Sequence, residues 1–174
     1  MPQILFVIYT SVMKVIPEIQ QIGIIHTSFT SPKGMPIQSS FADETSTGIV
    51  EIFDSYVSGL KDLDGFERIW LIYYFNQIHK TELTVKPFLD SHQHGVYSTR
   101  APVRPNHIGM SPVKLYSITG NRLEIGCIDV LDGTPLLDIK PYIPKFDSFT
   151  VNRAGWFDTV KNTAVTSDDR FNIK

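Results

Sequence analysis

The stretch VKLYSITGNRLEIGCIDV, residues 113–130, decides the fold class. Two runs rich in β-branched and aromatic residues, Val113–Ile118 and Leu123–Val130, flank the polar segment Thr119-Gly120-Asn121. A short polar connection with a glycine between two such runs is typical of a β-hairpin. The stretch therefore predicts two antiparallel strands.

Further short runs of strand character occur along the chain. They are GIIHT (23–27), Gly48–Phe53, IWLIYYF (69–75) and Lys80–Lys86. The third is apolar throughout, which predicts a central strand buried on both faces. Residues 54–67, DSYVSGLKDLDGFE, have apolar spacing that predicts one short helix. About six to seven strands with one helix favour an all-β fold, a small antiparallel β-barrel, over a doubly wound α/β fold.

The chain of 174 residues is 42% hydrophobic, enough for one sizeable core. We expect a barrel domain over residues 21–148. Residues 1–20 are an N-terminal extension or an edge strand, and 149–174 form a tail that wraps the body through Trp156 and Phe157. The apolar run Ile4–Tyr9 is too short to span a bilayer, so we expect no membrane anchor. A single cysteine, Cys127, suits a reducing cytoplasm, and we expect a cytoplasmic protein.

The formal net charge of −2 argues against a generally basic nucleic-acid binder. The charge is uneven, however, because residues 1–79 hold four Lys/Arg against eight Asp/Glu, whereas 80–145 hold eight against six. A local basic surface in the second half therefore stays possible.

Two segments of the second half predict one functional site. Gly95–Pro112 sets Arg100 and Arg104 among three prolines, so we expect a stiff loop that fixes its arginines. Leu131–Tyr142 places charged residues around a glycine and a proline, which is typical of a shaped pocket wall.

Several familiar chemistries are excluded. The sequence has no glycine-rich phosphate loop, no nucleophile elbow and no H-E-x-x-H motif. His92 and His94 could meet a metal with Asp90, but no further ligand has matching spacing, so we expect no metal site. A small hydrolase using Asp138 and His92 would rest on scattered residues only.

The strings TRAPVRPNHIGMS (99–111) and LDGTPLLDIKPYIPKFDS (131–148) resemble the TsaA-like (TrmO) family of S-adenosylmethionine-dependent tRNA methyltransferases. The resemblance extends through IGIIHT and GLKDLDGFERIWLIYYF and covers about residues 21–148. It implies a small antiparallel β-barrel that works as a homodimer, with the cofactor S-adenosyl-L-methionine near the subunit interface. It also implies methylation of N6 of threonylcarbamoyl-adenosine at position 37, in the tRNA anticodon loop.

The resemblance assigns cofactor contacts to eleven positions. They are Pro36, Ile37, Gln38, Asn76, Gln77, Arg100, Met110, Asp132, Gly133, Thr134 and Pro135. Ile37 replaces a residue that is usually basic in the family, and Asn76 and Gln77 replace a usual His-Lys pair. S-Adenosylmethionine carries a carboxylate, a sulfonium, a ribose and an adenine, so an arginine, a carboxylate and apolar cover suit it.

The segment after the cofactor turn offers candidates for the chemistry. Asp138, Lys140 and Tyr142 have i, i+2, i+4 spacing, which puts their side chains on one face of an extended segment. The hypothesis is Asp138 as base or orienter, Lys140 stabilising negative charge and Tyr142 stacking or donating a hydrogen bond. The alternative is a structural Asp–Lys pair.

Phosphate contacts are predicted for Arg104, Lys114 and Lys145. Arg104 could instead brace its own loop. The competing hypothesis for the whole chain is a non-catalytic S-adenosylmethionine- or RNA-binding module, which the changes at Ile37, Asn76 and Gln77 keep open.

Overall fold

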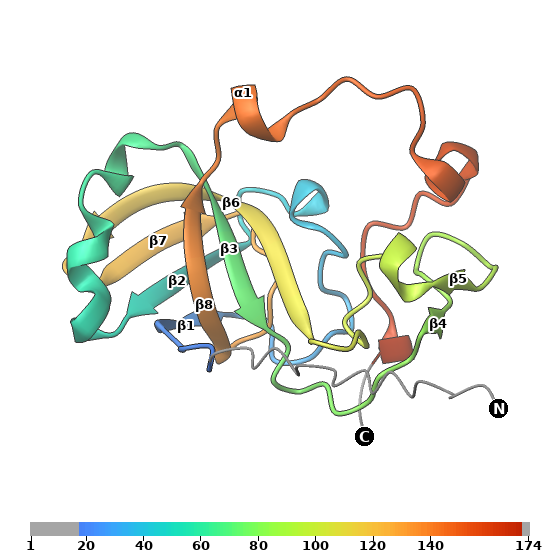
Figure 1. The fold of residues 1–174 in the computed structure, drawn as a ribbon, viewed down its shortest axis with the longest axis horizontal. Helices are drawn as coiled ribbons and strands as arrows, with labels where there is room; N and C mark the ends of the chain where they lie inside the picture. The colour runs from blue at the N-terminus through green and yellow to red at the C-terminus, as the bar shows by residue number, and fades with distance from the viewer. Residues whose placement is uncertain (1–17, 172–174) are drawn as a thin grey trace, which may run out of the picture.

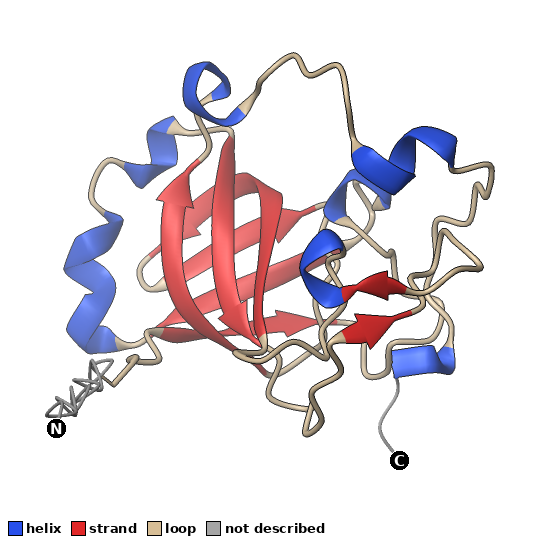
Figure 2. Ribbon diagram, turned by 45° about the vertical axis from the view of Figure 1, so that its right-hand side comes forward, coloured by secondary structure: helices blue, strands red, loops and turns tan. Residues whose placement is uncertain are grey.

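A closed barrel of six antiparallel strands forms the body of the protein (Figures 1 and 2). The computed structural model describes residues 18–171. In neighbour order the strands are β1 (Gly23–Thr27), β2 (Thr47–Ile52), β7 (Arg122–Gly126), β6 (Ile108–Thr119), β3 (Arg68–Tyr74) and β8 (Thr134–Pro141), and β8 closes on β1. The predicted antiparallel barrel is therefore confirmed. Seventeen of the residues in the predicted N-terminal extension lie outside the described part.

The barrel interior is filled by alternate residues of every strand. On β3, Ile69 and Leu71 are fully buried, while Trp70 and Ile72, which alternate with them, are half-buried on the outer side. Burial of such an aliphatic side chain contributes about 2 kcal/mol. The outer side of β3 is thus partly uncovered, so the prediction of a strand buried on both faces is wrong for the outer face.

The predicted hairpin is confirmed as β6 and β7, but β6 begins earlier than expected. Residues 108–112 pair with β3, from Tyr74↔Ile108 to Trp70↔Pro112, so this end of the predicted loop is strand. Gly109 makes the pairing possible, because a Cβ there would lie 2.3 Å from the Tyr73 ring. The arginines precede the strand in a loop, as predicted.

The helix expected over residues 54–67 is replaced by two 3-10 helices, η2 (Asp54–Leu60) and η3 (Leu63–Gly65). Asp62 between them has φ 65°, a left-handed conformation that no helix continues. Their apolar side chains still pack against the core. Within residues 18–171 the one α-helix is α1 (Pro144–Asp147).

The predicted strand over residues 80–86 is not part of the barrel. Only β4 (Thr84–Val85) forms there, and it pairs with β5 (His94–Gly95) in a separate two-stranded sheet. The sixth place in the barrel belongs to β8, whose prolines at positions 135 and 141 hide its strand character in the sequence.

A small lobe beside the barrel has its own apolar cluster. Val85, Val96 and Val103 are buried there together with Phe171 from the last described turn. The lobe also includes η4 (Val96–Ser98) and η6 (Asp169–Phe171). The C-terminal segment therefore contributes to a core and does not simply hang from the barrel.

The same C-terminal segment clamps the long loop between β1 and β2, which carries η1 (Ser39–Phe41). Pro36 forms a bridge with Thr166, and the Ile37 amide donates to the Val165 carbonyl at 3.0 Å. Between α1 and η5 (Gly155–Thr159) the chain arches from the barrel to the lobe (Figure 1). In the described part, no helix has the length and apolar character needed to cross a membrane.

Candidate active site

A cavity of about 940 Å³ lies where the barrel meets the lobe, the 32–41 loop and η5. Eight of the eleven predicted cofactor residues line it: Pro36, Ile37, Gln38, Asn76, Gln77, Arg100, Met110 and Thr134. These residues come from five separate segments of the chain. Folding thus brings most of the predicted set to one concave surface of a size suited to a small-molecule ligand.

One side of the cavity carries an arginine held in place by an amide. Arg100 Nη1 donates to Gln38 Oε1 at 2.5 Å, and Gln38 Nε2 donates to the Ile37 carbonyl at 2.6 Å. The C-terminal segment is hydrogen-bonded to the loop that carries Gln38. The position of Gln38, and with it that of Arg100, is therefore restrained. Arg100 is exposed and can meet a carboxylate with a charge-assisted hydrogen bond.

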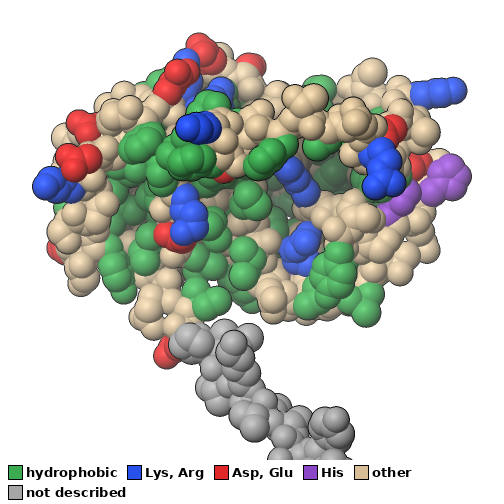
Figure 3. Space-filling model, turned by 45° about the horizontal axis from the view of Figure 1, so that its top comes forward, with side chains coloured by type: hydrophobic (Ala, Val, Ile, Leu, Met, Phe, Trp, Pro, Cys, Tyr) green, Lys and Arg blue, Asp and Glu red, His purple; other side chains and the backbone are tan. Residues whose placement is uncertain are grey.

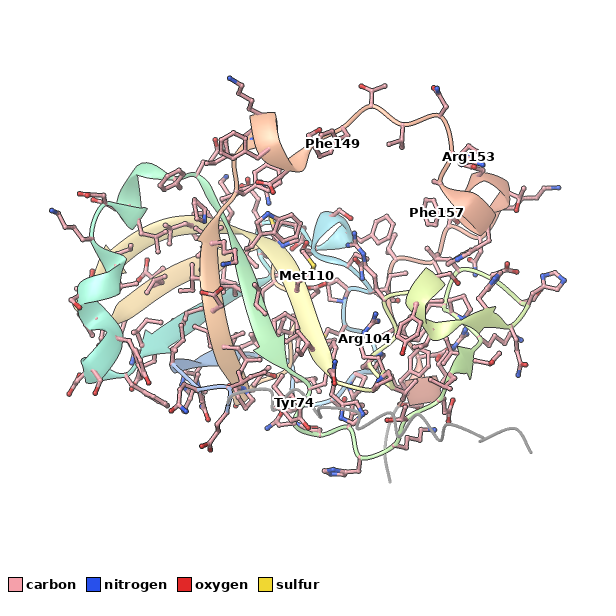
Figure 4. All side chains as sticks on the ribbon, in the orientation of Figure 1. Tyr74, Arg104, Met110, Phe149, Arg153 and Phe157 are labelled. Atoms are coloured by element: carbon pink, nitrogen blue, oxygen red, sulfur yellow. The ribbon has the colours of Figure 1, made fainter. Side chains whose placement is uncertain are left out.

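The barrel contributes an apolar surface to the cavity. Ile72 on β3 and Met110 on β6 are cross-strand partners on the outer side of the barrel, and both line the cavity. Met110 is 50% exposed, and Figure 4 shows it projecting from β6 on the side towards the lobe. A polarisable, flexible side chain there can pack against a flat ring.

The Asp132–Pro135 turn fixes the start of β8 against β1 by hydrogen bonds. Asp132 Oδ1 accepts from the Thr27 amide at 3.1 Å, and the Gly133 amide donates to the Ile25 carbonyl at 2.9 Å. Gly133 has φ 74°, a conformation that favours glycine. Asp132, Gly133 and Pro135 are not among the lining residues, whereas Thr134 is.

The three predicted chemistry residues lie outside the cavity lining. Asp138 and Lys140 are on the outer side of β8 and form an ion pair at 2.8 Å, with side chains 45% and 61% exposed. The Tyr142 ring packs against Trp70 with ring centres 5.7 Å apart. Asp138 and Lys140 therefore share a face as predicted, and their pairing matches the structural alternative.

The predicted RNA-binding cations are in three different situations. Arg104 lines the cavity and donates to the Thr99 and Ala101 carbonyls at 3.3 and 3.1 Å, so it braces its loop. Lys114 is paired with Glu44 at 2.8 Å, which raises the pKa of the lysine and lowers that of the glutamate. Lys145 is exposed on α1.

A buried polar cluster that the sequence analysis missed lies at the floor of the cavity. The Tyr73 hydroxyl and Ser111 Oγ are 3.0 Å apart inside the barrel mouth, and Asp129 lies beside them on the connection from β7 to β8. Tyr73 and Asp129 both line the cavity. Asp129 stands alone in the apolar run GCIDVL, and such an isolated carboxylate was the available signal.

Burial dominates the electrostatics of this cluster. It raises the pKa of Asp129 to about 6, against lowering by Ser111, the backbone amides of Asp129 and Ser39, and the Arg100 guanidinium. Burial also raises the pKa of Tyr73, and the negative charge of Asp129 adds to that rise. The tyrosine therefore stays neutral, while the aspartate titrates close to neutrality.

The histidine pair considered for metal binding is organised around one carboxylate. Ring nitrogens of His92 and His94 lie 3.0 and 2.9 Å from the two Asp90 oxygens, which lowers the pKa of Asp90. His94 also stacks on Trp156 with ring centres 4.6 Å apart. No cluster of three or more potential metal ligands occurs among residues 18–171.

Comparison with known proteins identifies the family. Residues 24–148 match the family model for the tRNA-methyltransferase O N-terminal domain. This chain belongs to the TrmO family. The match covers all six barrel strands except the first residue of β1, together with the cavity residues up to Thr134.

Individual TrmO-like relatives support the assignment. A protein of Pyrococcus abyssi named "Probable S-adenosyl-L-methionine-binding protein" is 50% identical over 137 residues, 79% of this chain and 74% of the relative. The mouse tRNA (adenine(37)-N6)-methyltransferase is 33% identical over 135 residues, 74% of this chain and 31% of the relative. The crystal structure of TrmO from Pseudomonas aeruginosa superposes with a TM-score of 0.68 at 34% identity, covering 82% of this chain and 63% of that one. The chain thus spans under two thirds of the mouse enzyme and of that crystal structure.

Proposed function

We propose that the chain is an S-adenosyl-L-methionine-dependent tRNA methyltransferase. It methylates N6 of N6-threonylcarbamoyladenosine at position 37 of its tRNAs. The observation that carries this proposal is the cavity, which gathers eight residues expected to hold the methyl donor from distant parts of the chain. The names of the mouse relative and of the Pseudomonas structure support the reaction type.

The cavity suits the methyl donor chemically. Arg100, fixed by Gln38, is placed for the donor's carboxylate, and Ile72 and Met110 offer apolar cover for its adenine. A bound donor supplies an electrophilic methyl group on a sulfonium. The protein's own part is to hold that group in line with the acceptor nitrogen and to exclude water, which accounts for much of the rate in such transfers.

Asp138, Lys140 and Tyr142 stay proposed residues of the acceptor side. Their place on the outer face of β8, outside the cavity lining, favours contact with the tRNA over contact with the methyl donor. Lys140 can approach a phosphate or a developing negative charge, and Tyr142 beside Trp70 offers an aromatic surface for an unstacked base.

Exposed apolar residues support the proposed homodimer. Met110, Phe149 and Phe157 are 50%, 77% and 48% exposed, and Phe149 and Phe157 lie at the two ends of the arch (Figure 4). Figure 3 shows hydrophobic side chains gathered on one face with Lys and Arg side chains among them. Apolar exposure of this kind is typical of interaction surfaces.

Light scattering in solution checks the dimer, and a monomeric mass at micromolar concentration would contradict it.

The decisive experiment is incubation with labelled S-adenosylmethionine and tRNA that carries or lacks the threonylcarbamoyl group, followed by nucleoside analysis. We expect N6-methylated product only with the modified tRNA. Arg100→Ala should weaken donor binding at least tenfold by calorimetry, whereas the matched change Arg122→Ala, on the far side of the barrel, should leave it unchanged. Donor binding without product on any tRNA would favour the non-catalytic module.

A further inference from the structure

Among the described residues, the one buried side-chain oxygen or nitrogen atom without a hydrogen-bond partner belongs to Asp129. Its Oδ1 has no hydrogen-bond partner, although the residue lines the cavity. Leaving a buried carboxylate oxygen unpaired costs stability, so such a group calls for an explanation. None of the cofactor contacts that the family resemblance implies involves Asp129.

The surroundings of Asp129 are built from four elements. Tyr73 faces it from β3, Ser111 from β6, Ser39 from η1 and Arg100 from the loop before β6. Among these, Arg100 is the only positive charge, and it is exposed and engaged by Gln38. The Asp129 carboxylate is therefore desolvated, and the nearby donors and Arg100 balance its negative charge only in part. It consequently accepts a proton more readily than an ordinary aspartate does.

The backbone that presents Asp129 is also unusual. Cys127, two residues earlier, is buried and has φ 56°, a left-handed conformation that is uncommon outside glycine. This bend follows directly on the end of β7 at Gly126 and begins the connection from β7 to β8. The fold thus accepts local strain at the connection that carries Asp129.

Methyl transfer to an N6 nitrogen requires a proton acceptor. As the N6–CH3 bond forms and the bond between sulfur and the methyl carbon breaks, the nitrogen must lose its hydrogen as a proton. The nitrogen's lone pair is delocalised into the purine and the carbamoyl group, so removal of this proton assists the attack. An effective acceptor needs a pKa near the working pH and a place in the cavity.

We infer that Asp129 is this proton acceptor. The inference rests on the proposed function. The Asp129 carboxylate takes the N6 proton and becomes a neutral acid, while the sulfonium becomes a neutral thioether, so charge and atoms balance. Asp138 is less suited, because its carboxylate is paired with Lys140 and is not part of the cavity lining.

The test compares single-turnover methylation by the wild-type chain and by Asp129→Asn over a range of about pH 5 to 9, together with donor affinity by calorimetry. The wild-type rate should rise with unit slope and level off above about pH 6. Asp129→Asn should lose at least a hundredfold in rate and the rising limb, with donor affinity within about threefold. Asp62→Asn is the matched control, since Asp62 is exposed, far from the cavity, and in a left-handed conformation that asparagine tolerates.

Three results would overturn the inference. The first is a near-normal rate for Asp129→Asn, and the second is a rate loss that donor affinity fully explains. The third is a flat wild-type profile below pH 7, which decides the matter even if the variant does not fold. If the wild-type chain binds the donor but methylates no tRNA at any pH, the proposed function itself fails and the inference fails with it.

Discussion

At the scale of single residues, Asp129 shows how a site for a ligand weakens a fold. Its pKa is raised by burial, so the folded chain holds this proton more strongly than the unfolded chain does. The contribution of protonated Asp129 to the free energy of unfolding is fully present below the ordinary pKa of 3.8. It is lost as the pH rises through about 6. At neutral pH the ionised carboxylate therefore destabilises the native state.

Asp129→Asn should for this reason be more stable than the wild type at pH 7.5. The rise of the Asp129 pKa from 3.8 to about 6 corresponds to about 3 kcal/mol at pH 7.5, and the gain should vanish below about pH 4. Thermal unfolding of both proteins across this pH range measures the difference. A variant that is less stable at pH 7.5 would show that the carboxylate is needed for folding.

At the scale of elements, the contact between β3 and β6 depends on a missing side chain. A Cβ at Gly109 would lie 2.3 Å from one Tyr73 ring atom and 2.8 Å from the Phe75 ring, and both rings form part of the cavity wall. The tightly packed tyrosine has little room to move, because its hydroxyl is bound to Ser111.

Gly109→Ala should accordingly lower the free energy of unfolding by about 1–3 kcal/mol, as overpacking does. It should also weaken donor binding by displacing Tyr73. Gly59→Ala is the control, because no atom lies within 4 Å of a Cβ there and its φ is ordinary. Denaturant unfolding gives the comparison, and equal stability of the two variants would refute the steric argument.

The C-terminal segment is an element of the site as well as of the lobe. Phe171 is 7% exposed and packs edge-on against Phe88, while residues 165–167 pair with the loop that carries Gln38. Loss of the Phe171 anchor should therefore loosen the cavity wall more than it loosens the barrel.

Phe171→Ala should cost about 3 kcal/mol, and the Ile37 amide should exchange with solvent much faster. Barrel amides such as that of Ile25 should keep their protection. Hydrogen exchange measures both, with Phe146→Ala as control because Phe146 is 63% exposed. Unchanged exchange at Ile37 would mean that the segment does not hold the loop.

Some of these elements could be predicted from the sequence and some could not. The hairpin of β6 and β7 and strands β1, β2 and β3 have local signals, namely β-branched runs and a turn glycine. Strand β8 was not predicted, because Pro135 and Pro141 are unusual in a strand. The segment Asp54–Gly65 has apolar spacing but lacks the uninterrupted length that an α-helix needs. Most predicted cofactor positions came from family resemblance, whereas the Tyr73–Ser111–Asp129 cluster depends on tertiary packing that no local pattern encodes.

At the scale of the whole molecule, the formal net charge of −2 has to be reconciled with the proposed substrate, a polyanionic tRNA. Local cations must carry the attraction, and they are not equivalent. Lys114 is already neutralised by Glu44, whereas Lys145 is exposed on α1. Binding should then involve few phosphate contacts and depend moderately on salt.

The logarithm of tRNA affinity should fall linearly with the logarithm of salt concentration. Lys145→Gln should reduce that slope by about one, the value for a single phosphate contact, and Lys114→Gln should change it less. Filter binding or anisotropy at several salt concentrations measures the slopes. A salt-independent affinity would argue against electrostatic recognition of the backbone.

Closure of the barrel through β1 and β8 has a consequence for the order of events during synthesis. The hydrogen bond between Thr27 and Asp132 joins residues 105 positions apart in the chain. The pairing of β1 with β8, which it accompanies, closes the barrel. β1 and β2 can pair early, but the free edge of β2 must wait for β7, and that of β1 must wait until β8 leaves the ribosome. During that interval the nascent chain exposes unpaired strand edges. Its need for protection from aggregation is greatest at this stage.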